Sequence, residues 1–128
     1  MGGFTLKYIQ GGTSFKERRL HYTMSYLKSE MELLDFAATL RVHINYERNA
    51  YNSLRKKCSE IETSNPSKEN FYLEQALDNQ AFRHDCILSE LESLCEDFMY
   101  MLTDEGQKAV SARFTHVDNC LKKEGINS

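Results

Sequence analysis

The fold is decided by Ser64-Asn65-Pro66-Ser67, four residues that stand between two long stretches of helical character. Pro66 is the only proline of the chain, and all six glycines lie outside residues 13–105. Serine, asparagine and proline favour turns because they fix the backbone or hydrogen-bond to it locally. With one strong helix breaker in its middle, the chain is predicted to form two long helices that meet at this turn.

The segment after the turn, over about residues 67–102, has apolar residues at alternating steps of four and three. This spacing is typical of a heptad seam, along which one helix packs against another. Polar groups interrupt it at only two positions. The predicted seam consists of Leu73, Leu77, Gln80, His84, Ile87, Leu91, Leu94, Phe98 and Met101.

The segment before the turn, over about residues 14–62, begins with the capping box Ser14-Phe15-Lys16-Glu17. So long a helix either continues unbroken or breaks within Thr39–Asn45, where β-branched residues and asparagine weaken it. Near Ala37 the apolar stripe shifts by one residue, a slip that marks a change of supercoiling or the place where a third helix joins. The seam of the second half consists of Leu40, Ile44, Glu47, Tyr51, Leu54, Cys58 and Ile61.

Folding the two segments about the turn brings both seams together in one antiparallel register. In each facing pair the two residue numbers have the same sum, so Leu40 faces Leu91 and Ile44 faces Ile87. The polar interruptions also coincide, because Glu47 comes level with His84. The remaining pairs are Tyr51 with Gln80 and Leu54 with Leu77.

A third helix is predicted over residues 104–123, with acidic residues at its start and Gly125 just after its end. Its apolar stripe is Val110, Phe114, Val117 and Leu121. We expect this stripe to pack on a widened apolar flank of the second helix, formed by Ala81, Leu88 and Cys95. Residues 1–13 are predicted to be an extended N-terminal arm.

The chain has 128 residues and a net charge of −3, which suits one soluble domain over residues 14–128. The predicted fold is all-α: a long antiparallel, coiled-coil-like hairpin with a shorter third helix, in a bundle completed by dimerisation. No stretch is apolar enough to span a bilayer, and no secretory signal is recognised. The four cysteines lack metal-site spacing and are expected to be free thiols in the cytoplasm.

The polar interruptions of the two seams are interpreted as a buried polar layer that fixes the register of the hairpin. Its members are Glu47, Tyr51, Gln80 and His84. An alternative interpretation adds His43, one turn before Glu47, and makes a metal or hydrolytic site of His43, Glu47 and His84. The first interpretation is preferred, so no metal and no cofactor are predicted.

Arg41, Arg48 and Arg55 recur every seven residues and form a basic strip beside the seam. Such a strip is usually a salt-bridging flank, with Arg55 expected near Glu74. The alternative is a docking strip for an acidic protein or for a nucleic acid. A nucleic-acid-binding regulator is less favoured, because the chain has no surplus of positive charge.

The first helix is predicted to extend beyond the end of the second, so that residues 15–29 have no partner within the hairpin. An exposed stripe rich in tyrosine and methionine is typical of interfaces. The sequence therefore predicts a non-enzymatic interaction protein, of the inhibitor, immunity or adaptor type, that binds a protein partner and forms a homodimer. The predicted contact residues are Leu20, Tyr22, Met24, Tyr26 and Leu27, together with Arg41, Arg48 and Arg55.

Overall fold

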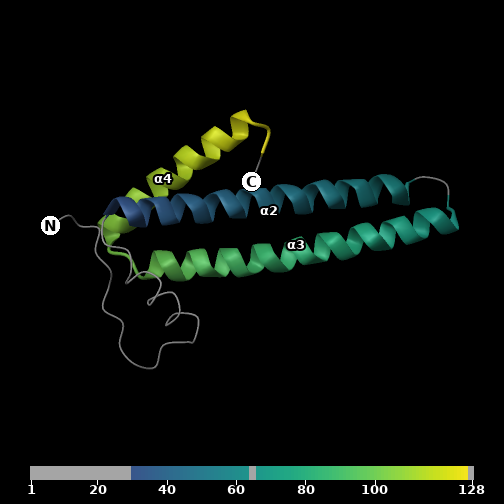
Figure 1. Ribbon diagram of the computed structural model, residues 1–128, viewed down its shortest axis with the longest axis horizontal. Coiled ribbons are helices and arrows are strands. Elements are labelled where there is room, and N and C mark those ends of the chain that lie inside the picture. The colour runs from purple at the N-terminus through teal and green to yellow at the C-terminus, as the bar shows by residue number, and fades with distance from the viewer. Residues whose placement is uncertain (1–29, 64–65, 127–128) are drawn as a thin grey trace, which may run out of the picture.

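The computed structural model describes residues 30–63 and 66–126, and these form three α-helices (Figure 1). Helix α2 spans Glu30–Glu62, α3 spans Lys68–Tyr100 and α4 spans Asp104–Lys123. Helices α2 and α3 run in opposite directions and lie side by side along their lengths, and α4 turns back along α2. The predicted all-α class is confirmed, with helices packed as in a bundle.

The ends of the helices follow from local hydrogen bonds. The Ser67 hydroxyl accepts a hydrogen bond of 3.0 Å from the backbone N–H of Asn70 and caps the start of α3. Thr103 caps α4 in the same way, through the N–H of Gly106 at 3.2 Å. Gly125 follows α4 with a φ of +84°, and the N–H of Ile126 bonds back to the carbonyl of Leu121. This is the Schellman arrangement, which favours glycine because a side chain would strain the left-handed backbone.

Helix α2 is continuous through Thr39–Asn45, so of the two alternatives the unbroken helix is the one observed. The β-branched residues there lower helix propensity by only a few tenths of a kcal/mol each. Ile44 is buried against α3, and burying an isoleucine side chain contributes about 1.5–3 kcal/mol. Packing therefore outweighs local propensity in this part of the helix.

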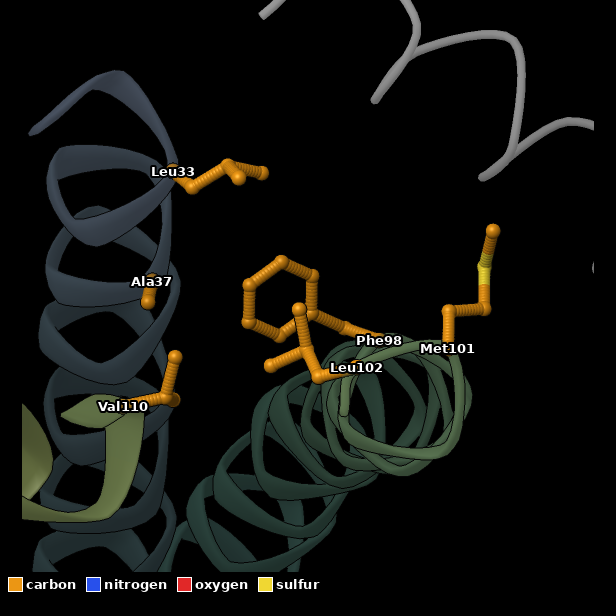
Figure 2. Close-up of a cluster of buried hydrophobic side chains, with 6 residues drawn as sticks. All are labelled: Leu33, Ala37, Phe98, Met101, Leu102 and Val110. Atoms are coloured by element: carbon orange, nitrogen blue, oxygen red, sulfur yellow. The ribbon is translucent and has the colours of Figure 1, made fainter. Parts of the chain in front are cut away.

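The main core lies where the start of α2, the end of α3 and the start of α4 meet (Figure 2). Phe98 is completely buried, and its ring centroid lies 5.3 Å from that of Phe36 in a tilted arrangement. Aromatic pairs of this geometry add about 0.5–1.5 kcal/mol to the gain from burial. The buried members of the cluster are Leu33, Ala37, Phe98, Met101, Leu102 and Val110.

A second cluster continues the contact between α2 and α3 and corrects the predicted seam of α3. Ile44 packs in this cluster with Leu40 and Leu88, whereas its predicted partner Ile87 is 46% exposed. Ala81, predicted to lie on the flank, is also buried. A straight helix has 3.6 residues per turn, so its contact stripe drifts from a strict heptad, and Ala81 and Leu88 are buried in place of Gln80 and Ile87.

Helix α4 packs against α2 and makes few contacts with α3, contrary to the prediction that it covers Ala81, Leu88 and Cys95. Helix α2 therefore lies between α3 and α4 and presents a different face to each (Figure 1). Leu33 and Ala37 belong to the face toward α3. Leu34 and Ala38 share their face with Arg41, which contacts α4. The predicted slip in the apolar stripe marks this second face.

None of the helices described is both long enough and apolar enough to cross a membrane. The predicted N-terminal arm, and the part of the first predicted helix before Glu30, lie outside the described residues.

Candidate interaction surface

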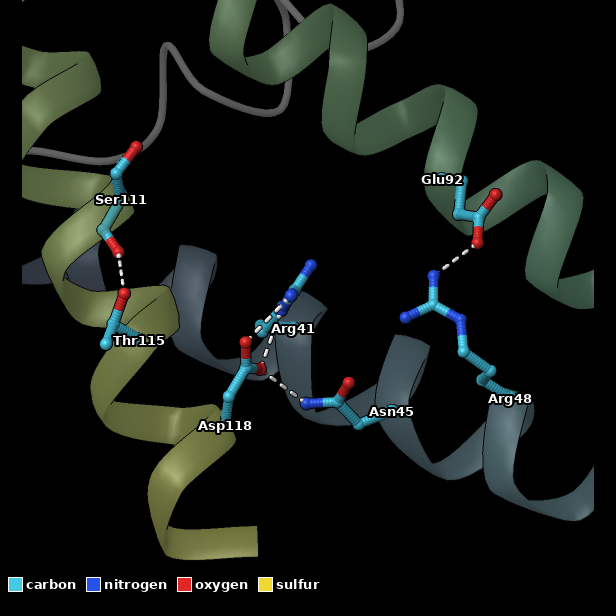
Figure 3. A network of polar contacts seen from close by, with 7 residues as sticks. All are labelled: Arg41, Asn45, Arg48, Glu92, Ser111, Thr115 and Asp118. Carbon is cyan, nitrogen blue, oxygen red and sulfur yellow. Dashed lines mark hydrogen bonds and ion pairs between the residues drawn. The ribbon is translucent and has the colours of Figure 1, made fainter. Parts of the chain in front are cut away.

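A polar contact joins the central helix α2 to α4 (Figure 3). The guanidinium group of Arg41 donates two hydrogen bonds to the Asp118 carboxylate, from Nε to Oδ1 and from Nη2 to Oδ2, each 2.8 Å long. The Asn45 amide donates a third, also 2.8 Å, to Oδ1. The Arg41 guanidinium also lies 5.3 Å from the centre of the Phe114 ring. This arrangement orients the Arg41 side chain and attaches α4 to α2.

The charges of this contact stabilise each other. Hydrogen bonds from Arg41, and less strongly from Asn45, hold the pKa of Asp118 below its usual value, although partial burial opposes the shift. The Asp118 carboxylate in turn raises the pKa of Arg41. The Asn45 side chain is buried, and its Oδ1 has no hydrogen-bond partner among the described residues. Its orientation is fixed because only the NH₂ group can donate to a carboxylate.

Each arginine of the predicted docking strip is paired with an acid of the same chain. Arg48 Nη2 lies 2.6 Å from Glu92 Oε1 on α3. Arg55 Nη1 lies 2.6 Å from Asp78 Oδ1, and the charge of Arg55 also acts on Glu74, one turn earlier on α3, as the prediction that Arg55 lies near Glu74 implies. The role of the strip in docking stays a prediction.

The predicted polar layer is centred on one contact between α2 and α3. His84 Nδ1 and Glu47 Oε2 are joined by a hydrogen bond, and both side chains are half-buried. Tyr51 is also half-buried. Gln80 is exposed because α3 turns Ala81 toward α2 in its place, so the layer is smaller than predicted.

The residues of the alternative metal site are not brought together. His43 is exposed, one turn from Glu47. Within residues 30–63 and 66–126, no group of three histidine, cysteine or acidic residues has the geometry to hold a metal ion.

All four cysteines are free thiols, and two of them are shielded by the helices. Burial raises the pKa of Cys58, and a hydrogen bond to Asp78 at 3.3 Å raises it further. Burial also raises the pKa of Cys95, although the nearby Arg41 guanidinium opposes this change. A raised pKa lowers the fraction of reactive thiolate, so both residues act as small apolar groups in the packing.

The sequence did not predict that α3 presents a surface of large exposed apolar side chains. Eight large hydrophobic side chains are exposed among the described residues, and six of them belong to α3. A heptad pattern assigns apolar residues to a seam, so it gave no reason to expect them outside it. This α3 apolar surface consists of Phe71, Tyr72, Leu73, Phe82, Ile87 and Tyr100.

The surface begins at a shallow hollow beside the turn, where Phe71 and Ile61 line one wall. Glu62 and Glu74 lie in the same hollow, and a hydrogen bond between their carboxyl groups raises the pKa of Glu74. This end of the hairpin therefore combines apolar side chains with negative charge.

The other predicted contact residues, Leu20, Tyr22, Met24, Tyr26 and Leu27, lie outside the described residues. No protein-family model, curated protein or solved structure matches this chain.

Proposed function

We propose that this chain is a non-enzymatic interaction protein that binds a protein partner through the α3 apolar surface. The observation that carries the proposal is the concentration of exposed aromatic and aliphatic side chains on one helix of three. Aromatic residues are enriched in protein interfaces, and clustered apolar exposure on a folded domain is typical of a binding site.

The free energy available from burying this surface in a complex is large enough for specific binding. Phe71 is 56% exposed and Phe82 is 67% exposed. Burial of a phenylalanine side chain contributes about 1.5–3 kcal/mol, so two such anchors account for a substantial share of a micromolar affinity.

The arginine pairs favour protein binding over the nucleic-acid alternative. Arg41, Arg48 and Arg55 each face a carboxylate of the same chain, which reduces the positive potential that a phosphate backbone would meet. Arg48 and Arg55 then help to orient α3 on α2, and Arg41 helps to orient α4.

We further propose that α2 and α3 form a two-stranded antiparallel coiled coil and that the whole chain forms a homodimer. The alternating apolar steps of both segments and the polar contact between Glu47 and His84 within the seam support the coiled coil, because such a contact fixes register. The apolar stripe predicted within residues 15–29 supports self-association.

The binding proposal is tested by capture of partners from the native cell extract on immobilised protein, with quantitative mass spectrometry. The variant F71A/F82A should lose the captured protein by at least about tenfold, since the two alanines together remove more than about 1.4 kcal/mol of burial. Tyr46→Ala, an exposed aromatic on α2, is the matched control and should capture normally. Equal capture by F71A/F82A and the wild type would contradict the proposal.

A further inference from the structure

The C-terminal half of α3 is strongly acidic on the sides that α2 does not cover. Residues 84–100 contain five acidic residues and neither lysine nor arginine. Asp85 and Glu90 are exposed there, as are the apolar side chains of Ile87 and Tyr100. Glu92 lies 2.6 Å from Arg48 of α2 and forms an ion pair with it. This half of α3 therefore suits a partner that is both basic and apolar.

The chain itself contains a segment of that chemistry just before α2. Residues 14–28 include four basic residues and a single acid, Glu17. The basic residues are Lys16, Arg18, Arg19 and Lys28. In a helix, the spacing of Leu20, Met24 and Leu27 would place all three on one side of the segment and make that side apolar. The segment is thus complementary in charge and in pattern to the end of α3.

The expected direction of this segment selects the copy of α3 that it meets. No glycine or proline lies between residue 13 and Glu30, and the sequence predicts one helix from residue 14 into α2. Since the start of α2 packs beside the end of α3, such a helix would run past the end of its own α3. At a rise of about 1.5 Å per residue, fifteen residues extend about 22 Å beyond it.

We propose that residues 14–28 of each chain pack on the C-terminal half of α3 of a second copy, which makes a closed, symmetric dimer. A two-fold axis at the end of the hairpin places each segment on the other chain's α3, so both contacts form together and no further copy is added. Arg19 stands eleven residues before Glu30, and Glu90 stands ten residues before Tyr100, so the two come level. This inference rests on the proposed homodimer and identifies its interface.

The test is a charge exchange between chains, followed by sedimentation equilibrium and native mass spectrometry at low salt. One variant is R18E/R19E and the other is D85K/E90K. Each alone should dimerise at least about tenfold more weakly than the wild type, because like charges then face each other. A mixture of the two should form a one-to-one heterodimer, in which both contacts are again between opposite charges.

Two control variants change the same charges at the other end of the hairpin, where no contact is proposed. K56E/K57E and E60K/E69K alter exposed residues near the turn and should dimerise like the wild type. Circular dichroism of every variant establishes that the helices are retained.

The outcomes separate this inference from the proposed function. Unchanged dimerisation of R18E/R19E and D85K/E90K would overturn the interface and leave the homodimer standing. The mixture could also form no heterodimer while a chain with all four substitutions dimerises like the wild type. That result would overturn the proposed contact between chains, because the two charge clusters would then meet within one chain. A monomeric wild type would overturn both the interface and the homodimer, while partner capture through Phe71 and Phe82 is judged by its own experiment.

Discussion

Asp118 is the residue on which the attachment of α4 depends most. It accepts both hydrogen bonds from Arg41 and the one from Asn45, so three donated hydrogen bonds converge on a single carboxylate. Charge-assisted hydrogen bonds are about twice as strong as neutral ones, and a bidentate pair also fixes geometry.

Arg41→Ala should therefore destabilise the fold by about 1–3 kcal/mol, because it leaves the partly buried Asp118 without its cation and removes the contact with Phe114. Arg113→Ala is the matched control: its 3.2 Å pair with Asp35 is exposed and should contribute less than about 1 kcal/mol. Urea unfolding measures both. An equal loss in the two variants would contradict this assignment.

The same contact predicts how stability depends on pH. The folded-state pKa of Asp118 is held below its ordinary value of 3.8, so its contribution is present above that pH and is lost as the pH falls through the folded pKa. Asp118→Asn lacks this contribution. The wild type should be the more stable of the two at pH 7, and the difference should shrink below about pH 4. A difference that stays constant between pH 7 and pH 3 would count against the shift.

At the scale of helices, α3 has one side that builds the core and another that remains exposed. Phe98 and Phe82 represent the two sides, since the first is fully buried and the second is 67% exposed. Phe98→Ala should cost about 3–5 kcal/mol of unfolding free energy, as is usual for a buried phenylalanine. Phe82→Ala should change it by no more than about 0.5 kcal/mol. Similar losses in the two variants, measured by urea unfolding, would show that the exposed side of α3 is misassigned.

The Glu47–His84 contact is expected to specify the register more than to stabilise the hairpin. Both side chains are half-buried, so the pair contributes little net energy, whereas removing one partner leaves the other without its hydrogen bond, which is costly. His84→Leu should therefore destabilise the protein by about 1 kcal/mol, and E47L/H84L should recover that loss. Thermal unfolding of the two variants tests this, and a double variant less stable than the single one would contradict it.

The helices were more predictable than the contacts between them. Turn chemistry at Pro66 and caps at Ser67 and Thr103 depend on neighbouring residues, so the observed α3 and α4 begin close to where the sequence places them. The choice of Leu88 over Ile87 in the core depends on a rotation of α3 by one residue, and the partners of Arg48 and Arg55 depend on how the two helices pack. A heptad pattern does not resolve that rotation, because neighbouring apolar positions satisfy it equally well.

Asn45 shows a second reason why the contacts between helices were harder to predict than the helices themselves. It is buried only because α4 packs on α2, and Asp118 of α4 provides the partner for its amide. Nothing in the local sequence of α2 indicates that a distant carboxylate will be there. Buried polar groups of this kind are settled by tertiary packing.

For the molecule as a whole, the order α3, α2, α4 determines which surfaces can meet a partner. Because α4 covers one side of α2 and hardly touches α3, the outer side of α3 stays exposed along the length of the hairpin (Figure 1). Partner binding is proposed along this helix and self-association on its C-terminal half, so the two proposed surfaces share Ile87 and Tyr100. Both proposals depend on the antiparallel register of α2 and α3.

That register is tested most directly by a nuclear Overhauser spectrum of the isotope-labelled protein. The account predicts cross-peaks between the His84 ring and the Glu47 side chain, and between the rings of Phe36 and Phe98, within one chain. Cross-peaks from His84 to residues one heptad away on α2, such as Leu40 or Leu54, would contradict the register and the surfaces derived from it.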